Sequence, residues 1–96
     1  MFVVLLTYTR SHEELDAQLA AHRAFLDTQY AAGVFLASGP QIPRQGGVIL
    51  ARGVTREALQ ALLQQDPFAM HGLAEYTIVE FQARAVAPGL EAFVES

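Results

Sequence analysis

The sequence predicts a single α+β domain in which four strands form one antiparallel sheet and two helices cover one face of it. Three observations support this prediction. Short β-branched and aromatic runs recur along the chain, two stretches between them carry apolar residues at helical spacing, and the elements follow in the order β-α-β-β-α-β. The length of 96 residues is that of one domain. We expect a core over residues 1–86 and a C-terminal tail over residues 87–96.

The first two elements are predicted by local patterns. Residues 2–8 form a continuous apolar run, which is typical of a central strand that is covered on both faces. A helix of about 20 residues is expected next, because Ser11 and Glu14 have the spacing of a capping box and Gly33 can end the helix. Its inward stripe consists of Leu15, Leu19, His22 and Leu26.

Two further strands are expected in the middle of the chain. Residues 34–38 read as a strand that Gly39 and Pro40 stop, and residues 47–52 read as the next strand. The intervening residues 41–46 contain proline and glycine and are predicted to form a loop.

The last two elements follow in the same way. Thr55 can cap a second helix, which ends near Asp66 because the residue before a proline avoids helical angles. A final strand is expected over about residues 75–84. In the tail, an apolar triplet is expected to contact folded protein: Leu90, Phe93 and Val94.

This order of elements is that of the ferredoxin-like unit, whose strands lie in the spatial order 4-1-3-2. Two helices cover only one face of such a sheet, whereas the first three strands are apolar on both faces. A second copy of the chain would cover the open face. We therefore expect a homodimer, and closed rings built from dimers are compatible with the same argument.

Composition excludes several classes of function. A net charge of −4, from 6 basic and 10 acidic residues, argues against nucleic-acid binding. The absence of cysteine excludes disulfides and thiolate chemistry, and the absence of lysine excludes a Schiff base on the chain. No apolar run is long enough to span a membrane, and the first residues lack the pattern of a signal peptide. We expect a cytoplasmic protein that does not bind membranes.

His22 and Asp66 are the candidate catalytic residues. His22 lies on the apolar stripe of the first helix, where a lone imidazole must be hydrogen bonded, and histidine suits proton transfer near neutral pH. It can equally be a histidine at the edge of the core that bonds to backbone. Asp66 precedes Pro67, so it can be the N-cap of a helical turn, or it can orient His22.

Ser38 and Gly39 are candidates for substrate binding, since they end a predicted strand beside this region. Gly39 can permit a ligand to approach the backbone or can simply turn the chain. His12 is expected to be solvated, as are Asp16 and Asp27. The spacing of the three histidines fits no zinc motif, so we expect neither a metal nor a cofactor.

Several motifs occur together in one order: His22-Arg23-Ala24-Phe25-Leu26, Ser38-Gly39-Pro40, Gly46-Gly47, and Asp66-Pro67-Phe68 ahead of Gly72. With this set, residues 1 to about 85 resemble the YciI-like family, which is similar to the dimeric α+β barrel proteins. The resemblance implies two ferredoxin-like sheets packed face to face. It also implies an active-site pocket that contains His22 and Asp66, with Ser38 beside it.

The resemblance implies an activity only in general terms. Relatives include a dehydrochlorinase or chlorohydrolase that acts on chlorinated aromatic rings. One hypothesis is therefore a cofactor-free lyase, hydrolase or isomerase that acts on a small cyclic or aromatic molecule and uses a His-Asp pair as general acid and base. The alternative is a non-catalytic module that binds a small molecule or another protein. A His22–Asp66 contact that opens into a cavity favours the enzyme, whereas a filled core around both residues favours the module.

Overall fold

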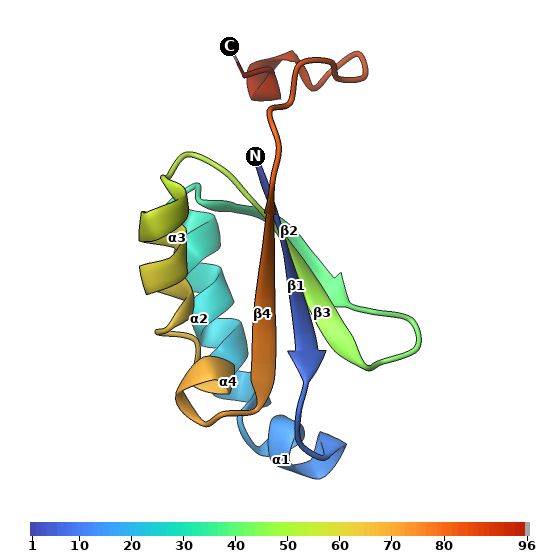
Figure 1. Cartoon of the computed structure of the whole chain (residues 1–96), viewed down its shortest axis with the longest axis vertical. Helices are drawn as coiled ribbons and strands as arrows, with labels where there is room; N and C mark the ends of the chain where they lie inside the picture. Colours follow the sequence, from blue (N-terminus) through green and yellow to red (C-terminus); the bar gives the residue numbers. More distant parts are fainter. Residues whose placement is uncertain (96) are drawn as a thin grey trace.

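A four-stranded antiparallel sheet forms the centre of the computed structural model, which describes residues 1–95 (Figure 1). The strands are β1 (Phe2–Tyr8), β2 (Phe35–Pro40), β3 (Gly46–Ala51) and β4 (Ala74–Glu80). They lie in the order β2-β3-β1-β4, so the apolar strands β1 and β3 are central, as predicted. In the register, Leu6 of β1 lies between Gly47 of β3 and Tyr76 of β4.

The helices are α1 (His12–Ala17), α2 (Leu19–Ala31), α3 (Arg56–Leu63) and α4 (Pro67–Met70), and a short 3-10 helix, η1 (Glu91–Phe93), lies in the tail. Of these, α2, α3 and α4 lie together on one side of the sheet, whereas α1 lies beyond the end of β1 (Figure 1). The core lies between the two layers and includes Phe2, Val4, Leu6, Leu15, Phe35, Ile49, Leu59, Leu63 and Phe68. None of the helices within residues 1–95 combines the length and the apolar character needed to cross a membrane.

The predicted helix ends depend on the expected capping residues. The Ser11 and Thr55 side chains accept hydrogen bonds from the amides of Glu14 and Ala58 at the starts of α1 and α3. Gly33 adopts a φ of 76° directly after the end of α2, a conformation that glycine adopts without the steric cost of a Cβ atom.

The long first helix of the prediction is interrupted at Gln18. The Gln18 backbone leaves helical angles, with φ −106° and ψ 3°, and the Gln18 amide bonds to the Leu15 carbonyl three residues earlier. The helix restarts at once, because the Gln18 carbonyl accepts the His22 amide. The apolar stripe does not reveal this break, since Leu15 and Leu19 remain on the side of the core.

Two strand ends also differ from the prediction. β2 continues through Gly39 and Pro40, which pair with Val48 and Gly47 of β3. Pro40 is tolerated because β2 is an edge strand, where the missing amide N–H leaves no ladder bond unmade. β4 ends at Glu80 and not at residue 84, since its partner β1 begins at Phe2, opposite Glu80.

The tail returns to the beginning of the chain. The Glu95 carboxylate lies 2.8 Å from the Met1 ammonium and accepts the Ala83 amide at 2.9 Å. Phe93 lies against the Arg52 guanidinium, 5.1 Å from ring centroid to Cζ. Leu90 and Val94 are 46% and 47% exposed, so the expected apolar docking is carried mainly by Phe93.

Gly46 allows β1 and β3 to lie close together at the start of β3. A Cβ atom built at this position would lie 1.8 Å from the Leu6 carbonyl oxygen, a backbone atom that cannot move aside alone. By contrast, a Cβ atom at Gly39 would meet no atom within 4 Å. Of the adjacent glycines Gly46 and Gly47, Gly46 is therefore the one that the close approach of the two strands requires.

We expect Gly46→Ala to lower the free energy of unfolding by about 1–3 kcal/mol or more, because the clash forces the two central strands apart. Gly39→Ala is the matched control and should change stability by no more than about 0.5 kcal/mol. Urea denaturation followed by circular dichroism measures both values. Equal stability of the two variants would contradict the assigned close approach.

Candidate active site

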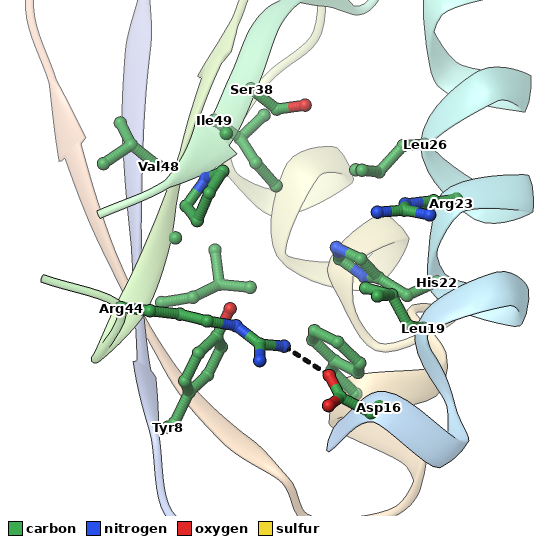
Figure 2. Close-up of a pocket in the computed structure, with 15 residues that line it drawn as sticks. Tyr8, Asp16, Leu19, His22, Arg23, Leu26, Ser38, Arg44, Val48 and Ile49 are labelled. Atoms are coloured by element: carbon green, nitrogen blue, oxygen red, sulfur yellow. Dashed lines mark hydrogen bonds and ion pairs between the residues drawn. The ribbon is translucent and has the colours of Figure 1, made fainter. Parts of the chain in front are cut away.

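A cavity of about 390 Å³ lies between α2 and the sheet, close to β2 and β3 (Figure 2). Its apolar wall consists of Leu6, Leu19, Leu26, Pro40, Ile49 and Phe68, and Val48 borders the cavity from β3 with its side chain on the other face of the sheet. Its polar side chains are those of Tyr8, Asp16, His22, Arg23, Ser38 and Arg44, and Gly39 and Gly47 complete the lining. A cavity of this size is near the lower end of ordinary ligand sites, which span about 300–1,000 Å³.

His22 is held in the cavity wall by two contacts. Its Nδ1 lies 2.7 Å from Asp66 Oδ1, and its ring stacks on Phe68 with centroids 3.9 Å apart and planes 2° from parallel. α2 supplies the histidine, whereas the Asp66-Pro67-Phe68 segment supplies both partners. The structure thus brings together the two candidate catalytic residues, 44 positions apart in the chain.

Asp66 is fully buried and accepts three hydrogen bonds. Oδ1 accepts the Phe68 amide at 3.0 Å, which makes Asp66 the N-cap of α4, and also faces His22 Nδ1. Oδ2 accepts the Tyr76 hydroxyl at 2.6 Å. The sequence left the cap and the histidine partner as alternative roles for Asp66. One carboxylate fills both.

These bonds assign the proton on His22. Burial raises the pKa of Tyr76, and the Asp66 carboxylate raises it further, so the hydroxyl stays protonated and donates. The Phe68 amide can only donate. Asp66 is therefore the acceptor of all three bonds, and the histidine nitrogen that faces it, Nδ1, carries the proton. In the neutral ring, Nε2 is then the unprotonated nitrogen.

Nε2 of His22 is open to the cavity. Within residues 1–95 no protein group bonds to it, and no buried side-chain nitrogen or oxygen in that range lacks a partner. An unbonded Nε2 on a residue that lines the cavity is therefore an accessible one. One nitrogen is oriented by a carboxylate and the other faces the cavity, which is a geometry that general-base chemistry can use.

The candidate binding residues Ser38 and Gly39 also line the cavity, on β2 opposite α2 (Figure 2). The Ser38 hydroxyl bonds to the Tyr30 hydroxyl, so it is already engaged by a side chain of α2. Because both residues line the cavity, they can contact a molecule in it without rearrangement of the backbone.

The other end of the cavity is closed by an ion pair that the sequence did not indicate. Arg44, from the loop between β2 and β3, lies 2.8 Å from Asp16 of α1 and extends over the Tyr8 ring. His12 Nε2 lies 2.9 Å from the Arg44 carbonyl oxygen. His12 and Asp16 are exposed, as expected, and both in addition attach this loop to α1.

Sequence reasoning missed Tyr76 as a partner of Asp66. Tyr76 is one of the alternating residues of the last strand, and only the pairing of β4 with β1 aligns it with the core side of Leu6. Arg23 and Arg44 were missed as cavity residues because isolated arginines carry no motif. Within the part of the chain that the structure describes, no group of three or more His, Cys, Asp or Glu side chains is arranged to hold a metal ion.

The fold is that of a ferredoxin-like α+β protein, and it holds a cavity beside a histidine–aspartate pair. A scan against family models identifies the YCII-related domain over residues 1–82. The chain therefore belongs to this family, which confirms the resemblance seen in the ordered motifs.

The fold is also found among solved structures. The chain is similar to one described as 5-chloro-2-hydroxyhydroquinone dehydrochlorinase (TftG) from Burkholderia phenoliruptrix AC1100, in complex with 2,5-dihydroxybenzoquinone. The TM-score is 0.70 at 17% identity, over 84% of this chain and 93% of that chain. At this identity the similarity confirms the ferredoxin-like fold. The comparison with curated proteins found no significant match.

We expect nitrogen-15 NMR to find His22 as the Nδ1-protonated tautomer at pH values where the ring is neutral, because Asp66 accepts at Nδ1. Asp66→Ala removes the acceptor at Nδ1 and should therefore lower the share of the Nδ1-protonated tautomer. Tyr76→Phe is the control: it removes one bond to Asp66 and should leave the tautomer unchanged. A wild-type ring protonated at Nε2 would contradict the assignment.

Proposed function

We propose that this protein is an enzyme that performs general acid–base chemistry on a small molecule bound in the cavity, with His22 and Asp66 as its catalytic pair. In this proposal Ser38 and Gly39 contact the substrate, and the chain acts as a single cytoplasmic domain. The reaction needs no cofactor, because a proton transfer uses only the imidazole and the substrate.

The observation that carries the proposal is that the two nitrogens of His22 are bonded differently. Nδ1 bonds to a buried carboxylate, whereas Nε2 has no protein partner within residues 1–95. A histidine that served only the core edge would be expected to use both nitrogens for structure. Here one nitrogen is left for a ligand, beside a cavity of about 390 Å³.

The chemistry balances with these groups alone. Nε2 takes a proton from the bound molecule, the ring becomes an imidazolium, and the adjacent Asp66 carboxylate stabilises the positive charge. In an elimination, the electron pair of the broken bond to hydrogen forms a double bond as a leaving group departs with its own pair. In an isomerisation, the proton returns to another atom of the same molecule.

An elimination of hydrogen chloride is the form of this chemistry that the structural neighbour suggests. That protein is described as a dehydrochlorinase, and its bound 2,5-dihydroxybenzoquinone is a small planar ring. The present cavity has apolar walls and the flat His22–Phe68 stack, which suit a planar ring as well. We therefore place a dehydrochlorinase-like lyase first among the candidate reactions.

We further propose that the active form is a homodimer in which the uncovered faces of two sheets pack together. On that face Leu5 is 36% exposed and Val79 is 48% exposed, and Val3, Val48 and Leu50 lie beside them. The helices α2, α3 and α4 lie on the opposite side of the sheet (Figure 1). A contiguous apolar face of this kind is typical of an interface.

We expect His22→Gln to reduce turnover by about 10²–10⁴-fold, because glutamine keeps the bulk of the side chain and cannot act as a base. The first assay is chloride release from 5-chloro-2-hydroxyhydroquinone, the compound in the neighbour's name, measured by ion chromatography. His71→Gln is the matched control, since His71 is exposed and lies outside the cavity lining.

Equal rates for wild type and His22→Gln would contradict the role of His22. If the wild type does not release chloride, deuterium incorporation from D₂O into a panel of cyclic carbon acids tests the base directly. A wild type that binds such compounds without exchange would favour the non-catalytic binding module.

Light scattering should give twice the chain mass of 10.5 kDa at micromolar concentration. The double variant Leu5→Asp, Val79→Asp should shift the protein to the monomer, because it introduces charges into the proposed interface. Gln60→Asp, on the exposed side of α3, is the control and should remain dimeric. A monomeric wild type would contradict the proposed assembly.

A further inference from the structure

One charged side chain of the cavity has no partner among residues 1–95. Asp16 and Arg44 neutralise each other at 2.8 Å, whereas Arg23 forms no ion pair or side-chain hydrogen bond within residues 1–95. Asp27, four residues further along α2, has the spacing of an ordinary surface ion pair with Arg23, and the pair is not formed. The guanidinium instead extends from α2 toward the cavity, beside His22 (Figure 2).

The lining of the cavity therefore presents one uncompensated positive charge, at Arg23. Its charged lining groups are Arg23, Arg44 and Asp16, of which the last two pair with each other, and the Asp66 carboxylate behind the wall is bonded to His22. The whole chain, by contrast, carries a net charge of −4. The Asp16 carboxylate is the only anionic group in this lining, and it forms an ion pair with Arg44. A cavity of this kind favours an anionic ligand over a neutral or cationic one.

The position of Arg23 relates this preference to the chemistry. Arg23 follows His22 directly in α2, so the guanidinium and the free Nε2 approach the cavity from the same helix. A guanidinium binds a planar carboxylate through two parallel hydrogen bonds, which fixes the orientation of the bound molecule as well as its charge. The apolar wall formed by Leu26, Ile49 and Phe68 then receives the rest of the molecule.

We propose that the cavity takes a small planar organic acid, whose carboxylate or ionised hydroxyl is bound by Arg23 while a proton on a neighbouring atom meets His22 Nε2. This inference rests on the proposed function of His22 and adds the substrate class and the residue that selects it. Proton transfer to Nε2 leaves the electron pair on a molecule that already carries a negative charge. The Arg23 guanidinium stabilises that additional charge.

The test compares two ligands that differ in charge and share their shape. The probes are 2-hydroxybenzoate and 2-hydroxybenzamide, titrated into the full chain and followed through the NMR amide signals of Ser38, Gly39 and Gly47. We expect the acid to bind at least about tenfold more tightly than the amide, as a charge-assisted bidentate contact provides. Arg23→Gln should remove this preference. Arg84→Gln changes the charge equally at a residue outside the cavity lining and should keep it.

The two proposals fail separately. His22→Gln should keep the preference for the acid, because it removes the base and leaves the guanidinium in place. Equal binding of acid and amide to the wild type, binding of neither, or an unchanged preference in Arg23→Gln would each overturn the inference about the substrate. None of these results depends on turnover, which tests His22 independently.

Discussion

The buried carboxylate of Asp66 is the constraint on which the site depends. A charge removed from water must be compensated by hydrogen bonds, and Asp66 obtains three of them from three parts of the fold. His22 comes from α2, the Phe68 amide from the first turn of α4, and Tyr76 from β4. Helix packing, helix capping and strand register thus meet at one side chain that is 0% exposed.

The same compensation makes the two faces of the site different. On the protein side of His22, donors and acceptors are matched and solvent is excluded. On the cavity side, Nε2 of His22 and the Arg23 guanidinium have no protein partner within residues 1–95 and remain available. A rigid, satisfied support behind a reactive group, with unsatisfied groups in front of it, is the arrangement that preorganises catalysis.

Much of the fold could be predicted because its signals are local. The caps at Ser11 and Thr55, the helix end at Gly33 and the Asp66-Pro67 turn each depend on residues within one helical turn. The strand order followed from the apolar runs of the central strands. Local signals could not predict the interruption at Gln18 or the early end of β4. These features depend on tertiary packing and on where the partner strand begins.

The candidate site was predictable only where one motif contained the signal. His22 stood out on an apolar stripe, and Asp66 stood out before a proline, although their contact joins residues 44 positions apart. Tyr76 becomes a partner of Asp66 only once the register of β4 against β1 is known. The Arg44–Asp16 pair likewise requires the loop to lie over α1, which no local pattern encodes.

Because Asp66 is also the N-cap of α4, the fold needs this residue whether or not the site is active. A lineage that lost its chemistry would still need the carboxylate to begin α4 and to satisfy Tyr76, so selection for folding alone would preserve half of the pair. His22 shares this structural role, because its Nδ1 donates to the same carboxylate, whereas Arg23 forms no ion pair or side-chain hydrogen bond within residues 1–95. Retention or loss of Arg23 among descendants would therefore record the history of the activity, whereas Asp66 would record the history of the structure.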